Sequence, residues 1–198
     1  MDLTKAEKYE HEWKAYLENT HNKILNTIKT NKRDLILDAS SGTGLLTKKM
    51  LKKEMPFKQM VLNEPVDDMR SLSEERFSQN PKIRHTKQLA KDIKEVNNYF
   101  TKILSVSSFH LYQDKEKSIQ KFHDILKPKG ELILLDWNRQ GLFKITNYFI
   151  KKYDDKEIET LSAKQTEKLL TKNGFKVEMQ EVWSHKYWNL YIIKARKS

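Results

Sequence analysis

The sequence contains no cysteine, which excludes disulfides, cysteine-ligated metal sites and thiolate nucleophiles. It also lacks any apolar run that approaches the roughly 20 residues of a membrane-spanning helix. The amino-terminal stretch MDLTKAEKYEHEWK is charged and amphipathic, without the apolar core of a secretory signal. The six histidines show no HExxH-like spacing, so we expect no metal site. These absences favour a cytoplasmic protein without a membrane span.

Arginine is scarce as well, although the formal net charge is +11. The chain has 6 arginines against 32 lysines, and arginine is the residue that makes bidentate contacts to phosphates and guanine edges. Many lysines stand beside acidic residues, as in DKEKS and KKYDDKEIE. A solvated lysine-rich surface is therefore favoured over a nucleic-acid interface, although such a surface can attract an anionic substrate.

Glycine and proline are limited to five and four residues, and they fall between segments of regular apolar periodicity. Helical spacing of apolar residues predicts helices over residues 5–30, 45–55, 66–79, 114–126 and 162–173. Short apolar runs predict strands over residues 34–39, 59–63, 83–86, 102–106, 131–136, 175–183 and 188–195. Strands that alternate with helices predict one α/β domain, with a mostly parallel sheet and helices on both faces.

One stretch, LILDASSGTGLLTKKM from Leu35 to Met50, carries the chemistry. A buried strand ends in Asp38, and a loop with Gly42 and Gly44 leads into a helix. Glycine lets the backbone approach a ligand closely, and the helix start offers unpaired N–H groups to a carboxylate or phosphate. Ligands of open α/β sheets bind beyond the carboxyl ends of the strands, where this loop falls. An ordinary strand-to-helix turn with two glycines is the alternative interpretation.

The next predicted strand ends at Glu64, about 20 residues after the loop, where nucleotide-binding folds place a carboxylate on the ribose hydroxyls. The run DASSGTG, VLNEPVDDM, LAKDI, FTKILSVSSFHLY and FHDILKPKGELILLDW resembles the class I methyltransferases in order and spacing. The likeness spans about residues 33–137 and is greatest to the compact quinone and small-molecule methyltransferases. It implies S-adenosylmethionine as cofactor and S-adenosylhomocysteine as product.

The resemblance implies a Rossmann-like α/β sandwich of three layers. Its seven-stranded sheet would be mostly parallel, with an antiparallel closing strand and helices on both faces. We expect one methyltransferase domain over residues 1–198, as a monomer or a homodimer. Within it, residues 1–31 would form a helical cap, 32–136 the cofactor-binding half, and 137–198 a lid segment followed by the closing strands.

Cofactor-binding roles follow from the resemblance, position by position. The methionine end of the cofactor would be held by Asp38, Ala39, Ser40, Ser41, Gly42, Thr43 and Gly44, with Ser105 reaching it from the fourth strand. Glu64 would bind the ribose diol, Pro65 and Met69 would flank the adenine, and Leu89 and Ala90 would lie at its edge.

Three positions depart from the family pattern. Ser40 stands where a first glycine is usual, and Thr101 replaces the common aspartate after Phe100. Leu89 replaces the frequent acid near the adenine amino group, which would weaken binding. A dinucleotide-binding loop would need a third glycine where Thr47 stands, so the methyl-donor interpretation is preferred.

Methyl transfer from a sulfonium is an in-line displacement, which a protein promotes mainly by aligning the reactants and excluding water. His110, just past the fourth strand, is the best candidate for a general base, with a packing role as the alternative. Tyr9, Trp13 and Trp137 are candidate substrate contacts, and Trp137–Tyr153 is either a movable cover or fixed core. Cytosine C5 methylation is excluded because it needs a cysteine.

The chain has no room for a separate substrate domain, so a small-molecule acceptor is favoured. Two alternatives stay open. One is an RNA methyltransferase that uses the lysine-rich surface, and the other is a module that binds the cofactor without catalysis.

Overall fold

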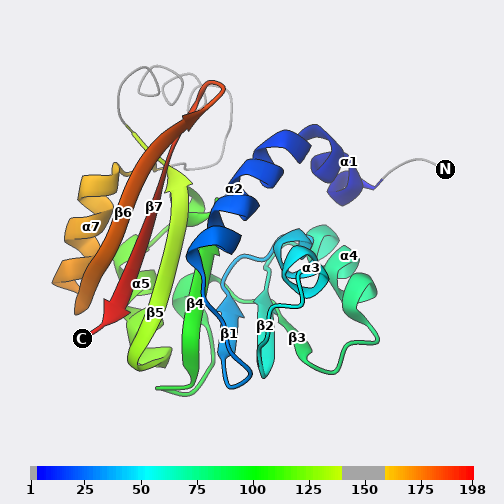
Figure 1. Ribbon diagram of the computed structural model, residues 1–198, viewed down its shortest axis with the longest axis horizontal. Coiled ribbons are helices and arrows are strands. Elements are labelled where there is room, and N and C mark those ends of the chain that lie inside the picture. Colours follow the sequence, from blue (N-terminus) through cyan, green and yellow to red (C-terminus); the bar gives the residue numbers. More distant parts are fainter. Residues whose placement is uncertain (1–3, 140–158) are drawn as a thin grey trace.

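The computed structural model describes residues 4–139 and 159–198, and it shows one sheet covered by helices on both faces (Figure 1). The strands are β1 Leu35–Asp38, β2 Gln59–Asn63, β3 Ile83–Thr86, β4 Phe100–Val106, β5 Leu126–Trp137, β6 Phe175–His185 and β7 Trp188–Lys197. The α-helices are α1 Lys5–Glu12, α2 Lys14–Thr27, α3 Leu45–Lys52, α4 Asp67–Phe77, α5 Lys115–Ile125 and α7 Ala163–Lys172. Two short 3₁₀ helices, η1 Ala90–Asp92 and η2 Phe109–Leu111, follow β3 and β4.

The seven strands within the described residues lie in the order β3-β2-β1-β4-β5-β7-β6. The pairs from β3 to β5 are parallel, and β7 is antiparallel to both β5 and β6. The predicted mostly parallel sheet with an antiparallel closing strand is thus confirmed. Because β1 lies between β2 and β4, the strand order reverses there, and a cleft opens at the carboxyl ends of β1 and β4.

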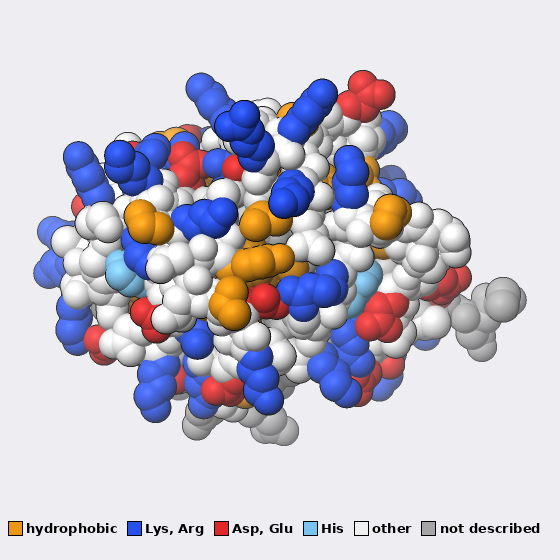
Figure 2. Space-filling view, turned by 90° about the horizontal axis from the view of Figure 1, so that it is seen from below, with side chains coloured by type: hydrophobic (Ala, Val, Ile, Leu, Met, Phe, Trp, Pro, Cys, Tyr) orange, Lys and Arg blue, Asp and Glu red, His pale blue; other side chains and the backbone are white. Residues whose placement is uncertain are grey.

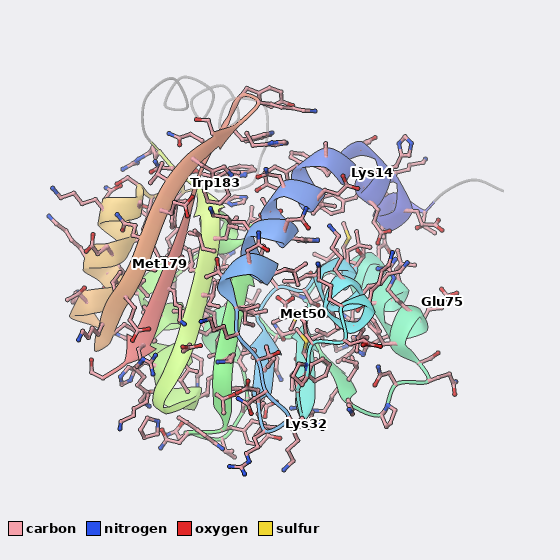
Figure 3. The ribbon with its side chains drawn as sticks, in the orientation of Figure 1. Lys14, Lys32, Met50, Glu75, Met179 and Trp183 are labelled. Carbon is pink, nitrogen blue, oxygen red and sulfur yellow. The ribbon has the colours of Figure 1, made fainter. Side chains whose placement is uncertain are left out.

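Alternating side chains of the central strands feed two apolar layers. On one face, Leu37 and Ile103 join a cluster with α5 and α7. On the other, Ile36 and Leu104 pack with α2, α3 and the end of α4. Met50 of α3, labelled in Figure 3, is fully buried in this second layer. Burial on both faces explains why these strands read as continuous apolar runs rather than as alternating ones.

Several element boundaries differ from the prediction by a few residues. The stretch 5–30, expected to form one or two helices, forms α1 and α2, which meet at Trp13. Strand β5 begins at Leu126 instead of residue 131, because the KPKG stretch continues the strand after a register shift opposite β4. No helix of residues 4–139 and 159–198 is both long and apolar enough to cross a membrane.

Helix α2 is fixed to the carboxyl edge of the sheet by aromatic contacts. Tyr16 and Trp188 pack edge to face, and the indole of Trp137 stacks on Trp188 at 4.8 Å between ring centroids. The Tyr16 hydroxyl accepts from Trp137 Nε1 (2.9 Å) and donates to Ser107 Oγ (2.8 Å). At the other side of the helix, Trp183 of β6 donates to Asn19 (Figure 3). The amino-terminal helices therefore belong to the same packed body as the sheet.

The buried amide of Asn63 ties the carboxyl ends of three neighbouring strands together. Its Nδ2 donates to the carbonyls of Ala39 (2.9 Å) and Gln88 (2.8 Å). Its Oδ1 accepts from the Thr86 hydroxyl and the Gln88 N–H, both at 2.9 Å. All four hydrogen-bonding positions of the amide are used, so the loops after β1, β2 and β3 are held in one arrangement.

We predict that Asn63→Ala destabilises the protein by about 2–4 kcal/mol, because it removes the four hydrogen bonds of this buried amide to Ala39, Thr86 and Gln88. Urea unfolding measures this change. The control is Asn22→Ala on the exposed side of α2, which should leave the stability within about 0.5 kcal/mol. Equal stability of both variants would show that the amide does not constrain the strand ends.

Candidate functional site

A cavity of about 410 Å³ lies beyond the carboxyl ends of the strands, within the size range of ligand sites. The loops after β1, β2, β3 and β4 line it, and α1 contributes Tyr9. Seven of the predicted cofactor-binding residues meet in its wall: Ser40, Gly42, Glu64, Pro65, Met69, Leu89 and Ala90.

A smaller cavity of about 50 Å³ lies behind the glycine loop. Asp38, Ser41 and Thr43 line it, and α2 contributes Leu17 and His21. Its remaining wall is made partly of residues that also line the larger cavity: Tyr9, Ser40, Gly42, Val106 and Ser107. The two cavities therefore adjoin, and together they bring most of the predicted cofactor-binding residues to one edge of the sheet.

The two loop glycines are needed for different physical reasons. Gly42 has φ +54°, and a Cβ built on it meets no atom within 4 Å, so it faces open space. Gly44 has φ +78°, and its Cβ would lie 2.6 Å from the Phe77 ring and 2.7 Å from Ser73 Oγ. We expected both glycines to allow close approach to a ligand, and the open space beside Gly42 is compatible with that role, which stays a prediction. Gly44 is required by the packing of α4 against the loop.

The carboxylate of Glu64 joins the end of β2 to the glycine loop. It accepts the Gly42 N–H at 2.8 Å on Oε2 and the Val66 N–H at 2.9 Å on Oε1. The side chain is 7% exposed, and this burial raises the pKa of the carboxyl, although the two backbone hydrogen bonds partly oppose the rise. A carboxylate has further acceptor capacity beyond these two bonds, which suits a pair of hydroxyl groups.

Asp38 and Ser41 each have a polar atom without a hydrogen-bond partner among the described residues. Within the described part of the chain, Asp38 Oδ1 and Ser41 Oγ are buried and form no hydrogen bond. Burial raises the pKa of the Asp38 carboxyl to about 7, with an opposing contribution from the Ser40 backbone amide and a further rise from Glu64. A buried carboxylate of this kind suits a cationic group, so these residues fit the amino end of a methionine-type cofactor.

Ser40 and Ser105 belong to a hydroxyl cluster around Tyr112. The Tyr112 hydroxyl lies 3.0 Å from Ser40 Oγ, 3.1 Å from Ser105 Oγ and 3.3 Å from Ser108 Oγ. The serine that replaces the usual glycine at position 40 therefore supports a cavity-lining tyrosine. Ser105 is fully buried behind Tyr112, so any effect of Ser105 on the cofactor would pass through that ring.

The other two departures also have local explanations. The Thr101 hydroxyl donates to Asp34 Oδ1 at 2.8 Å and accepts the Leu35 N–H at 3.1 Å, so it bonds to an acid from the neighbouring segment. Leu89 is 47% exposed at the cavity wall. Polar side chains of Gln88, Gln113 and Asp114 line the same cavity and provide acceptors that leucine lacks.

The predicted substrate contacts occupy different places. Tyr9 lines both cavities, and burial together with the nearby Glu64 and Glu10 carboxylates raises the pKa of its hydroxyl to about 12. Trp13 stacks on Tyr9 at 6.2 Å, and Trp137 lies in the aromatic cluster with Tyr16 and Trp188. The remainder of the predicted cover, residues 140–153, lies outside the described residues.

His110 forms a close pair with Asp136 at the end of β5. Its Nδ1 lies 2.6 Å from Asp136 Oδ1, and its backbone N–H donates to Oδ2 at 2.7 Å. The imidazole stacks on Trp137 with 3.8 Å between centroids and 12° between planes. A carboxylate on one nitrogen is the arrangement that orients a histidine base. His110 does not line either of the two cavities in the described part, and its catalytic role stays a prediction.

Four residues of the site escaped the sequence analysis: Asn63, Arg76, Ser107 and Tyr112. Arg76 of α4 donates to the Thr43 carbonyl and pairs with Glu10 of α1 at 2.9 Å, so it joins α1 to the glycine loop. Ser107 holds φ +54° at the end of β4, an uncommon conformation for a side-chain-bearing residue. The only available signals were polar residues at strand ends, such as Asn63 after a buried run.

The chain has a Rossmann-like α/β fold with a cavity at the point where the strand order reverses. A family model described as a methyltransferase domain matches residues 8–180, and the chain belongs to that family. The class predicted from the sequence, the S-adenosylmethionine-dependent methyltransferases, is thereby confirmed.

An uncharacterized methyltransferase of Oceanobacillus iheyensis is 26% identical over 165 residues, which cover 82% of this chain and 66% of that protein. The chain thus spans just under two thirds of that relative's length. A protein solved in complex with the Haloferax volcanii Trm112 methyltransferase activator has a TM-score of 0.83 at 10% identity, covering 97% and 95% of the two chains. A SAM-dependent methyltransferase of Methanosarcina mazei has a TM-score of 0.72 at 16% identity, covering 88% and 96%. These structures show the shared fold.

We predict that Gly44→Ala lowers the melting temperature more than Gly42→Ala, because only the former clashes with Phe77 and Ser73. Both share the cost of a left-handed backbone, about 1 kcal/mol. Gly42→Ala should instead weaken binding of S-adenosylhomocysteine, because its methyl group enters the cavity. Thermal melts and calorimetric titrations separate the two effects. The opposite order of melting temperatures would contradict the packing role of Gly44.

We predict that binding of S-adenosylhomocysteine releases about half a proton at pH 7, since the Asp38 pKa of about 7 leaves this carboxyl half protonated. An ammonium partner lowers that pKa, so release should approach one proton near pH 5.5 and vanish above about pH 8.5. Calorimetry in buffers of different ionisation enthalpy measures the release.

Two controls isolate Asp38. The first is 5′-methylthioadenosine, which has the same ribose and adenine but lacks the amino-acid end with its α-amino group, so titration of Glu64 is common to both ligands. The second is Asp38→Asn, which should abolish the difference between the ligands. Equal proton release with both ligands in the unaltered protein would contradict the assignment of Asp38 to the amino group of the ligand.

Proposed function

We propose that this chain transfers the methyl group of S-adenosylmethionine to a small-molecule acceptor by in-line displacement. The observation that carries the proposal is the sorting of polar groups along the adjoining cavities. Glu64 stands beside the larger one, and the unpartnered Asp38 and Ser41 atoms lie behind the glycine loop. When bound, the cofactor supplies an electrophilic methyl group on a sulfonium.

The residues of the chain then act mainly by positioning. Glu64 holds hydroxyl groups at a fixed point because its carboxylate is itself held by the Gly42 and Val66 amides. Tyr9 and Tyr112 close the cavity from α1 and from the loop after β4, which excludes water from the reacting atoms. Alignment and exclusion of water are sufficient when the acceptor is already deprotonated.

His110 is the proposed base for an acceptor that must lose a proton. Asp136 fixes its Nδ1, which leaves Nε2 for the acceptor.

A small acceptor agrees better with the surface than an RNA does. On the face where the parallel strands begin, away from the cavities, Lys and Arg side chains are scattered among acidic and uncharged ones (Figure 2). Several basic side chains are also engaged in ion pairs, such as Arg76 with Glu10 and Arg84 with Glu95. A nucleic-acid site requires a continuous basic footprint instead.

We predict that S-adenosylhomocysteine at 100 times its dissociation constant stabilises the protein by roughly 2.7 kcal/mol, which raises the melting temperature by about 5–10 °C. NAD should cause no shift. With labelled S-adenosylmethionine and a cell extract separated by size, the label should enter the small-molecule fraction. Label in RNA would overturn the acceptor class, and stable binding without any labelled product would overturn the enzymatic function.

The variant that tests the role of Glu64 is Glu64→Gln, which keeps the size and one acceptor oxygen of the side chain. It should weaken S-adenosylhomocysteine binding by about tenfold, because hydrogen bonds to a charged carboxylate are lost. Glu75→Gln on α4, where Glu75 points outward into solvent (Figure 3), should bind normally. Normal binding by Glu64→Gln would contradict the assignment of Glu64 to the ribose hydroxyl groups.

A further inference from the structure

The small cavity behind the glycine loop contains a third buried polar atom without a partner. Within the described residues, His21 Nδ1 forms no hydrogen bond, as is also true of Asp38 Oδ1 and Ser41 Oγ. All three side chains line the same cavity of about 50 Å³. Buried polar atoms are normally satisfied, so three unpartnered ones around one space indicate a ligand with several hydrogen-bonding groups.

His21 comes from α2, outside the glycine-loop motif. The side chain is 7% exposed, and α2 is held in place by the hydrogen bond from Tyr16 to Ser107 and by its aromatic contacts. The imidazole is thus fixed against the cavity before any ligand binds. Burial, together with nearby Lys49, lowers the pKa of His21 to about 3, so the ring is neutral and offers one N–H donor.

The cavity is lined by groups that complement both charges of a zwitterion. Asp38 offers a carboxylate to an ammonium group. Ser41 and His21 offer neutral donors, and the start of α3 lies beside them at Leu45 and Leu46 with its positive dipole end. The N-cap of α3, Gly44, has no side chain that could bond the first amides of the helix. Neutral donors, a helix start and a carboxylate that line one cavity match an α-amino acid.

We propose that His21 donates a hydrogen bond from Nδ1 to the α-carboxylate of the cofactor's methionine moiety, beside Ser41, while Asp38 receives the ammonium group. The assignment rests on the proposed function. It gives the amino-terminal helix a direct part in cofactor binding. His21 is a positioning residue that selects ligands with an intact amino-acid end.

The test compares two ligands by calorimetry on the full chain. S-adenosylhomocysteine has the amino-acid end, and 5′-methylthioadenosine lacks it but keeps the adenosine part. His21→Leu should weaken the binding of S-adenosylhomocysteine by at least about tenfold and leave the binding of 5′-methylthioadenosine unchanged. Only the former ligand loses a hydrogen bond between the protein and a charged group. His21→Asn places an amide N–H near the position of Nδ1 and should restore most of the affinity. His11→Leu, at an exposed histidine of α1, is the matched control.

Other outcomes overturn the assignment. Unchanged affinities in His21→Leu mean that the cavity holds an ordered water only. Equal weakening of both ligands means that the histidine supports the loop rather than the carboxylate. If His21→Leu fails to fold, His21→Asn should bind S-adenosylhomocysteine more tightly than His21→Gln, whose amide lies nearer the Nε2 position, and the reverse order refutes the contact. Failure of the unaltered protein to bind either ligand would refute the proposed function itself, a different result.

Discussion

Four hydrogen bonds meet at the buried amide of Asn63, where the carboxyl ends of β1, β2 and β3 converge. The next residue, Glu64, begins from a fixed backbone position, and its carboxylate in turn holds the Gly42 amide. The glycine loop is therefore positioned from the neighbouring strand as well as from its own. Without this chain of bonds, a loop with glycines at positions 42 and 44 would sample many conformations, and the cavity would not be formed in advance.

The sequence was sufficient for the architecture because the determinants of the fold are local. The buried run LILD, the continuous apolar run around Ile133 and the capping pair Ser162 and Gln165 each specify an element without distant contacts. The seven-stranded sheet and its antiparallel closing strand came from the family resemblance. Local patterns mislead where local and tertiary preferences compete, as at residues 127–130, which belong to a strand that the apolar run predicts to begin at residue 131.

The site was predicted in part, and the division has a physical basis. Gly42 and Glu64 could be proposed from the sequence because a glycine in a strand-to-helix loop and a carboxylate after the next buried strand form a pattern of fixed spacing. The roles of Arg76, Tyr112 and Ser107 arise from contacts between elements far apart in the chain, such as Arg76 with Thr43 and Glu10. Gly44 shows a further difficulty, because its requirement comes from Phe77 on α4 and resembles a ligand-binding requirement in the sequence.

The amino-terminal helices connect these observations. Helix α1 contributes Tyr9 to both cavities and is tied to the glycine loop through Glu10 and Arg76. Helix α2 is bonded through Tyr16 to Ser107, which lines both cavities, and to Trp137, which stacks on His110. A displacement of these helices would therefore move the wall of the cofactor cavity and the histidine pair together. Because one aromatic cluster supports both, helix α2 is packed against the cavity wall and against the candidate base at the same time.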